Sequence, residues 1–218
     1  MRAYLIILLI SFSWSMSDGN RFSKKVEYEY SAYIDLLNIK IGEASLSVEE
    51  SDNIEGRDVY HLNFSVKTSK LGDRIYKIRN KIDVWIDKEN LNVVRQEKSV
   101  REVRKKKKSI TSIQGELAIT NGKKYIINEN TFDPYSLLLI LPEFEIPIET
   151  SKKFNIVDAG KVREIELTNK GFRKIRTPYG TFSAYTLTPS KSDDSILKNK
   201  GDMEVSYASI GDNLVPVE

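Results

Sequence analysis

Apolar residues recur at every second position along most of this 218-residue chain. The pattern begins at Val26, where apolar and polar side chains alternate as far as Ile34, and it returns over residues 60–66 and 76–86. A period of two places the apolar side chains on one face of a β-strand, as in an antiparallel sheet that is solvated on its other face. The sequence therefore predicts a mainly β protein.

Turn-forming residues separate the predicted strands. Asn121-Gly122 lies between two short alternating runs, and a two-residue hairpin favours residues that adopt positive φ. Ala159-Gly160 and Pro178-Tyr179-Gly180 are expected to reverse the chain similarly, and residues 51–53 also interrupt the alternation. The apolar positions switch parity across Gly42, which predicts a β-bulge there because an extra residue is needed to change face.

Residues 133–142, with the sequence DPYSLLLILP, do not alternate. Asp133 is a favourable N-cap, Pro134 suits the first helical position, and Pro142 ends the apolar run. These signals predict a short buried helix near residues 134–141, with a continuous buried strand as the alternative. Because a sheet must cover its apolar face, we expect one strongly curved antiparallel sheet, open or partly closed into a barrel, wrapped around this helix.

The first residues have the layout of a secretory signal peptide. Arg2 precedes an apolar run over residues 3–10, and small residues follow, including Ser15 and Ser17. An uncleaved anchor is the less favoured interpretation, because a span needs about 20 apolar residues. We expect cleavage after Ser17, with Ser15 as the close alternative. The signal peptide would then occupy residues 1–17 and a single β-rich domain residues 18–218, exported and without a transmembrane span after processing.

The absence of cysteine and the presence of one histidine narrow the possible chemistry. Disulfides, thiolate nucleophiles and cysteine zinc sites are excluded. His61 falls on the polar face of its strand without a G-x-S-x-G motif, so we interpret it as a solvated side chain. Paired carboxylates such as Glu27 and Glu29 are equally typical of the wet side of a sheet. No phosphate-binding or calcium-binding loop occurs, so we expect a non-enzymatic protein with no catalytic, cofactor or metal site.

Positive charge is concentrated in residues 95–108. This stretch has eight basic and two acidic residues, a net charge of +6, whereas the whole chain carries +3. A solvated hairpin tip whose lysines discourage edge pairing is the favoured interpretation. The alternative is contact with anionic lipid or envelope polysaccharide. Nucleic acid is not an expected partner, because the run contains no stacking aromatic residue. The candidate contact residues are Arg101, Arg104, Lys105, Lys106, Lys107 and Lys108.

Four motifs carry a family resemblance: residues 41–44 (IGEA), 85–87 (WID), 133–134 (DP) and 177–182 (TPYGTF). In this order the chain resembles, from about Phe22 to Glu218, a family of exported bacterial proteins catalogued as domain of unknown function 3108. The resemblance implies a mainly β protein of the periplasm or cell envelope with no established activity, and it supplies no catalytic or ligand residue. Chains of this family usually continue past the Pro216-Val217 motif into another strand. If that strand is missing here, its neighbour has an unpaired edge, and the alternatives are a shortened variant, a truncated gene product or an edge completed by a partner.

Three functions compete. The first is a binding or carrier module for an apolar or lipid-like ligand, with a groove lined by Tyr76, Trp85, Tyr135 and Leu138, although ordinary core packing is the favoured explanation of these residues. The second is a structural or interaction protein of the envelope that contacts anionic surfaces through the basic stretch. An enzyme is the least favoured, because it would need a polar pocket that gathers His61 with distant carboxylates.

Overall fold

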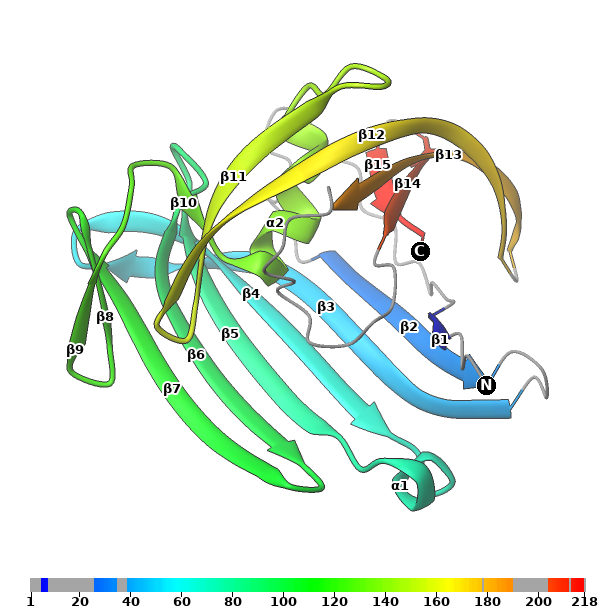
Figure 1. Ribbon diagram of the computed structural model, residues 1–218, viewed down its shortest axis with the longest axis horizontal. Coiled ribbons are helices and arrows are strands. Elements are labelled where there is room, and N and C mark those ends of the chain that lie inside the picture. Colours follow the sequence, from blue (N-terminus) through cyan, green and yellow to red (C-terminus); the bar gives the residue numbers. More distant parts are fainter. Residues whose placement is uncertain are drawn as a thin grey trace.

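The computed structural model describes residues 5–7, 26–34, 39–177, 179–189, 204–211 and 213–217. Strands make up 70% of the structure and helices 8%, which confirms the mainly β class. The strands form two sheets rather than one (Figure 1). The expectation of a single strongly curved or partly closed sheet is wrong, because neither sheet is closed or strongly curled over the described ranges.

The first sheet is an antiparallel meander of nine strands in which each strand pairs with the next along the chain. Its strands are β1 (Leu5–Ile7), β2 (Val26–Ile34), β3 (Ile39–Ile54), β4 (Arg57–Thr68), β5 (Arg79–Asp87), β6 (Val93–Glu102), β7 (Lys105–Gln114), β8 (Leu117–Thr120) and β9 (Lys123–Ile126). A single helical turn, α1 (Gly72–Ile75), connects β4 to β5. The alternating runs predicted over residues 26–34 and 60–66 lie in β2 and β4, whereas the run predicted over residues 76–86 is a strand only from Arg79 onward.

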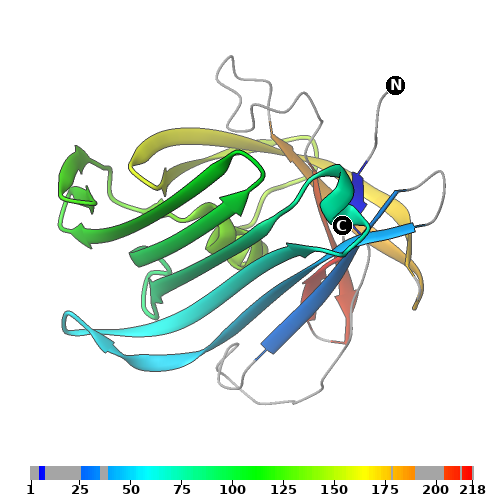
Figure 2. The same ribbon diagram turned by 90° about the horizontal axis from the view of Figure 1, so that it is seen from below.

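The second sheet has six strands, again in chain order. They are β10 (Thr131–Phe132), β11 (Ser151–Asp158), β12 (Lys161–Thr177), β13 (Gly180–Pro189), β14 (Val205–Ile210) and β15 (Asn213–Pro216). Among the described strands, β10 and β11 are the only parallel pair. The two ribbon views show this sheet lying across one face of the nine-stranded sheet (Figures 1 and 2). The apolar face is therefore covered by a second layer, which removes the need for closure.

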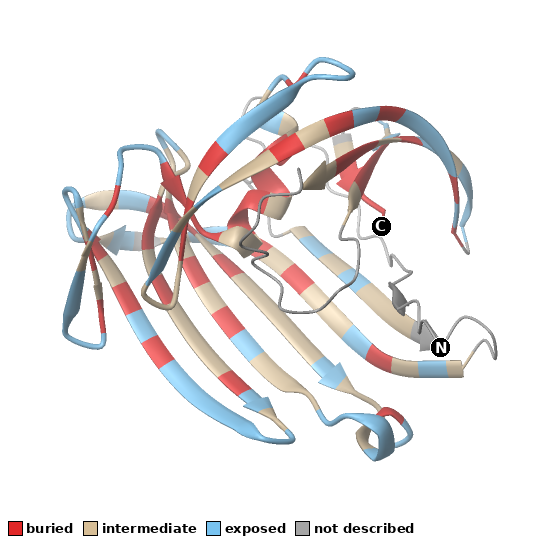
Figure 3. Ribbon diagram, viewed as in Figure 1, coloured by how far each residue is buried: buried red, intermediate tan, exposed pale blue. Residues whose placement is uncertain are grey.

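The predicted helix is confirmed as α2 (Pro134–Ile140), which continues into a 3₁₀ turn over Leu141–Glu143. It lies between the two sheets (Figure 1). One core cluster joins Leu62 of the first sheet, Ile140 of α2 and Leu187 of the second sheet. Buried positions alternate along the strands and gather around the helix, whereas the first four residues of β7, Lys105–Lys108, are exposed (Figure 3).

Most of the predicted turns are observed. Asn121-Gly122 and Ala159-Gly160 both form hairpins with φ of 48°/81° and 49°/82°. The bulge is confirmed beside Gly42, where the β2–β3 register shifts and leaves Ile41 outside the paired positions. Residues 51–53 do not reverse the chain: β3 continues to Ile54 with a second register irregularity, and the reversal is at Glu55-Gly56.

The N-terminal prediction falls mainly outside the described residues. Of residues 1–17, only Leu5–Ile7 is described, and it pairs as β1 with Ala32–Ile34 of β2. Both candidate cleavage positions, Ser15 and Ser17, are outside the described ranges. Among the helices that are described, none is long and apolar enough to cross a membrane.

Candidate functional site

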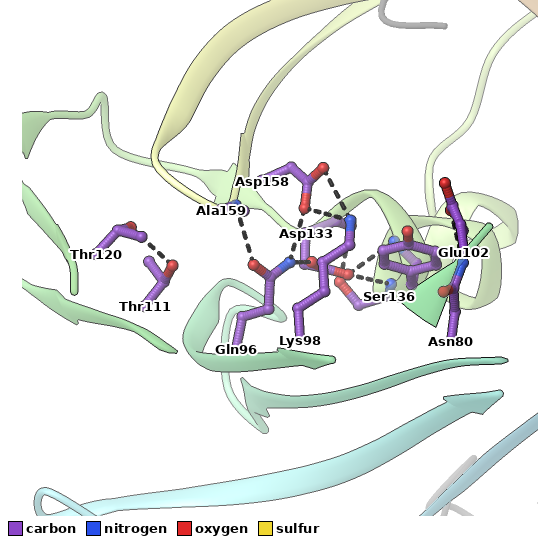
Figure 4. Close-up of polar contacts among 11 residues, drawn as sticks. Asn80, Gln96, Lys98, Glu102, Thr111, Thr120, Asp133, Ser136, Asp158 and Ala159 are labelled. Carbon is purple, nitrogen blue, oxygen red and sulfur yellow. Dashed lines mark hydrogen bonds and ion pairs between the residues drawn. The ribbon is translucent and has the colours of Figure 1, made fainter. Parts of the chain in front are cut away.

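Polar side chains are buried where the two sheets meet the N-terminus of α2 (Figure 4). Gln96 and Lys98 have the same strand parity as buried Val94 and Val100, so β6 directs them inward. Gln96 is 1% exposed and Asp133 is fully buried. We call Gln96, Lys98, Asp133 and Asp158 the polar junction.

The hydrogen bonds of the polar junction fix the orientation of the Gln96 amide. Its Oε1 accepts the Ala159 N–H at 3.1 Å, so its Nε2 faces the carboxylates and donates to Asp133 Oδ2. The other carboxylate oxygen, Asp133 Oδ1, accepts the Tyr135 and Ser136 N–H groups at 2.7 and 3.0 Å. Asp133 therefore caps α2 and at the same time binds a strand of the nine-stranded sheet.

An ion pair completes the connection between the sheets. Lys98 Nζ lies 2.9 and 3.0 Å from the two carboxylate oxygens of Asp158 at the end of β11. The same ammonium lies 4.9 Å from the centroid of the Tyr135 ring, which belongs to α2. Lys98 thus contacts both the helix and the second sheet.

Burial shifts the pKa values of both Asp133 and Lys98, and other contacts of the polar junction oppose each shift. Burial raises the pKa of Asp133 to about 7, helped by the negative charge of Asp158, although the three hydrogen bonds to the carboxylate oppose the shift. Burial lowers the pKa of Lys98, but the neighbouring Tyr135 and Asp158 outweigh it and raise that pKa overall. Asp133 therefore titrates near neutral pH while Lys98 stays charged.

The polar junction has the geometry of a structural contact. Gln96 and Asp133 are closed to solvent and their polar atoms bind one another, so a substrate has no access to them. Within the described ranges, no group of three or more His, Cys, Asp or Glu side chains is placed to hold a metal ion. Sequence reasoning found Asp133 as an N-cap but missed Gln96, Lys98 and Asp158. The sequence did contain a signal for Gln96 and Lys98. Each is a polar residue at a strand position where the residues two away on the same face, such as Val94 and Val100, are apolar.

His61 lies on the outer face of the nine-stranded sheet. Its Nε2 is 3.1 Å from Asp83, its Nδ1 is 3.7 Å from exposed Glu49, and its ring stacks on Trp85 at a centroid distance of 4.7 Å. Glu49 and Trp85 are its direct neighbours on the adjacent strands. Cross-strand pairing on a solvated face accounts for these contacts without a catalytic role.

The four residues expected to line a groove do not share one wall. Tyr135 and Leu138 both belong to α2, between the sheets. Trp85 lies on the outer face, where the Arg95 guanidinium is 5.9 Å from its ring centroid. Tyr76 is 46% exposed after α1, and its hydroxyl donates to Glu102 at 3.3 Å. The structure therefore brings together only the two helix residues.

The candidate contact residues lie at and beside the β6–β7 turn, as the hairpin-tip prediction requires. Arg101 is the penultimate residue of β6, Arg104 is in the turn, and Lys105–Lys108 begins β7. All six side chains are exposed. Because β8 pairs only with Thr111–Gln114, the lysines occupy the part of β7 that extends beyond β8. This position agrees with protection of a local sheet edge.

A second basic segment lies beside this tip. Tyr76 bonds Glu102, and Ile78 forms an isolated β-bridge with the same residue, so the α1 segment and the β6–β7 turn are at one end of the sheet (Figure 1). We call residues 70–77 and 101–108 together the basic end. Its nine basic side chains are exposed, and none forms an ion pair with another described residue; they are Lys70, Arg74, Lys77, Arg101, Arg104, Lys105, Lys106, Lys107 and Lys108. The sequence run alone did not reveal the first three.

The comparisons with known proteins identify a family but no activity. The family described as "Protein of unknown function (DUF3108)" matches residues 10–217. No curated protein and no solved structure matches the chain.

Proposed function

The chain belongs to DUF3108, a family described only as proteins of unknown function, and from its geometry we propose that it is a non-enzymatic protein of the bacterial envelope that binds anionic surfaces through the basic end. The observation that carries the proposal is the meeting of two exposed basic segments about 30 residues apart in sequence. Both acidic residues of the basic end are engaged: Asp73 pairs with Arg79 at 2.8 Å, and Glu102 accepts from Tyr76 and Asn80.

The concentration of positive charge at the basic end favours binding to an anionic surface over a general role in solubility. The whole chain carries only +3, so an anionic surface would be attracted by this end in particular. A basic residue close to an anionic membrane contributes about 1 kcal/mol, and several together give appreciable binding. Protection of the β7 edge explains Lys105–Lys108, but it does not explain Lys70, Arg74 and Lys77, which lie outside any strand.

The test removes charge from the basic end without changing the rest of the surface. Replacing each of Lys105–Lys108 with serine should abolish cosedimentation with phosphatidylglycerol vesicles at low salt. Binding of the unaltered protein should itself weaken at high salt, because screening shortens the reach of the charges to about 10 Å at 0.1 M. The matched control replaces four exposed lysines elsewhere, Lys123, Lys124, Lys170 and Lys174, with serine and has the same net charge. Equal binding by the two variants would contradict the proposal.

Carriage of an apolar or lipid-like ligand stays a prediction. The carrier hypothesis was based on a groove lined by four residues. Because Tyr76 and Trp85 lie apart from Tyr135 and Leu138, that groove is not formed and the carrier has no defined binding site. Native mass spectrometry of protein purified from envelope extracts would detect a bound lipid if one is carried.

A further inference from the structure

Exposed apolar side chains are interspersed with the cations of the basic end. The described part of the chain exposes ten large apolar side chains, and four of them are here. They are Leu71, Ile75, Tyr76 and Val103, with exposed fractions of 41, 65, 46 and 57%. An aliphatic side chain in water gains nothing from contact with a charged polysaccharide, but it gains free energy on entering a hydrocarbon layer.

We propose that the basic end docks on the surface of an anionic lipid bilayer and inserts Ile75 and Val103 between the lipids. This inference rests on the proposed function and deepens it by naming the surface as a membrane rather than a polysaccharide. The arrangement follows the pattern of interfacial protein segments, in which apolar side chains enter the headgroup region while flanking Lys and Arg contact anionic lipids.

The α1 segment is held in a defined position on the sheet. Its exposed apolar side chains are therefore also held in defined positions. Gly72 packs so closely on β3 that a Cβ at this residue would lie 2.0 Å from the Ile41 carbonyl oxygen. Arg79 donates to both carboxylate oxygens of Asp73 at 2.9 and 2.8 Å, and these bonds lower the pKa of Asp73. Leu71 and Ile75 are four residues apart, which places them on the same side of the turn.

Contact between the two segments makes one docking surface from them. The Tyr76 hydroxyl bonds Glu102, the residue that immediately precedes Val103. Asn80, at the start of β5, also bonds the end of β6: its Nδ2 donates to Glu102 at 3.1 Å (Figure 4). Its Oδ1 accepts the Arg101 N–H at 3.1 Å. Ile75 and Val103 are therefore presented from neighbouring segments, each with basic residues beside it.

The lack of cysteine allows insertion to be measured at single sites. Separate Ile75→Cys and Val103→Cys variants are labelled with the polarity-sensitive fluorophore NBD and mixed with phosphatidylglycerol vesicles. Emission from both sites should rise several-fold and shift to the blue. The control is Ile126→Cys, which is 79% exposed on β9 and away from the basic end. Its emission should not change, and dextran sulfate should change none of the three.

An unlabelled variant measures the contribution of the apolar side chains to binding. The double substitution Ile75→Ser and Val103→Ser keeps every cation, and it should lower partitioning onto phosphatidylglycerol vesicles by roughly tenfold or more. Its binding to dextran sulfate should be unchanged. All variants keep the same N-terminus, so any contribution of the apolar residues 3–10 is common to them.

The outcomes separate the two proposals. Vesicle binding with unchanged emission at residues 75 and 103 would overturn insertion and leave binding to an anionic surface intact. Unchanged partitioning of the double variant would likewise overturn insertion. Failure of the unaltered protein to bind either vesicles or dextran sulfate would overturn the proposed function as well. Because Ile75 and Val103 are exposed, circular dichroism should show an unchanged fold in each variant.

Discussion

At the scale of single residues, Asp133 shows how a local signal acquires a second role in the folded protein. Sequence alone identifies it as the N-cap of α2, and both cap hydrogen bonds are present. The same carboxylate also accepts from Gln96 of the nine-stranded sheet. Burial of this carboxyl group disfavours its charged form, whereas the three hydrogen bonds that it accepts favour the charged form.

This competition predicts a pH-dependent stability. The pKa of Asp133 is raised from 3.8 to about 7 in the folded protein, so the folded state binds a proton that the unfolded state releases. The stabilisation is fully present below pH 3.8 and is lost as the pH rises through about 7. Between about pH 5 and pH 8 the free energy of unfolding should fall by roughly 2–3 kcal/mol from this group. Urea unfolding at a series of pH values measures the fall.

The matched variant for this measurement is Asp133→Asn. Asparagine keeps a cap oxygen but turns its amide nitrogen toward the Gln96 amide, so the variant should be less stable at every pH. It cannot titrate, and its stability should therefore lack the fall assigned to Asp133. Parallel pH profiles for the two proteins would show that Asp133 does not titrate in this range. Asp158, Lys98 and Tyr135 face the same site and are unaltered in both proteins.

At the scale of elements, two hairpin turns of the same type differ in their surroundings. Gly122 and Gly160 have φ of 81° and 82°, a conformation that L side chains rarely adopt. A Cβ on Gly122 would have no heavy atom within 4 Å, whereas one on Gly160 would lie 3.0 Å from the Tyr125 ring. The β11–β12 turn of the second sheet therefore packs against β9 of the first.

This difference predicts unequal costs for one substitution. Gly122→Ala should reduce the free energy of unfolding by about 1–2 kcal/mol, the cost of the left-handed backbone alone. Gly160→Ala should cost more, because the aromatic ring must also move. Adding Tyr125→Leu should recover part of the extra cost at residue 160 and none at residue 122. Thermal unfolding of the unaltered protein, Tyr125→Leu, the two glycine variants and the two double variants measures these costs. Equal losses for the two glycine variants would contradict this account.

At the scale of the whole molecule, the two sheets share their main core cluster and are joined by α2 and the polar junction. The main core cluster contains residues of both sheets and of the helix. The Lys98–Asp158 ion pair links β6 directly to β11. Because of these contacts, we expect the two sheets to unfold together. The single domain predicted for residues 18–218 requires such cooperative unfolding.

Separate probes of the two sheets can test cooperative unfolding. Once Trp14 is removed by processing or by Trp14→Phe, Trp85 reports on the nine-stranded sheet, and amide exchange in β13 and β14 reports on the other. Both should give the same free energy of unfolding. Lys98→Met should lower both values equally, by about 1–3 kcal/mol, and the exposed control Lys170→Met should change neither. Unequal values for the sheets would show that they are independent units.

Most of the strands, most of the turns and the helix can be predicted from local sequence patterns, because each depends on neighbours within a few residues. Residue 42 showed its bulge through a change of parity, and Asp133-Pro134 showed the start of α2 through capping. A period of two also states which face of a strand is buried. It does not indicate what covers that face. Only the tertiary structure shows that a second sheet covers it, instead of closure of the first sheet into a barrel. The same reason applies to the polar junction, whose contacts join residues 37 to 63 apart in the chain, and to the basic end, where Tyr76 and Glu102 are 26 apart. Such contacts depend on how complete strands and helices pack together, and local sequence patterns do not specify that packing.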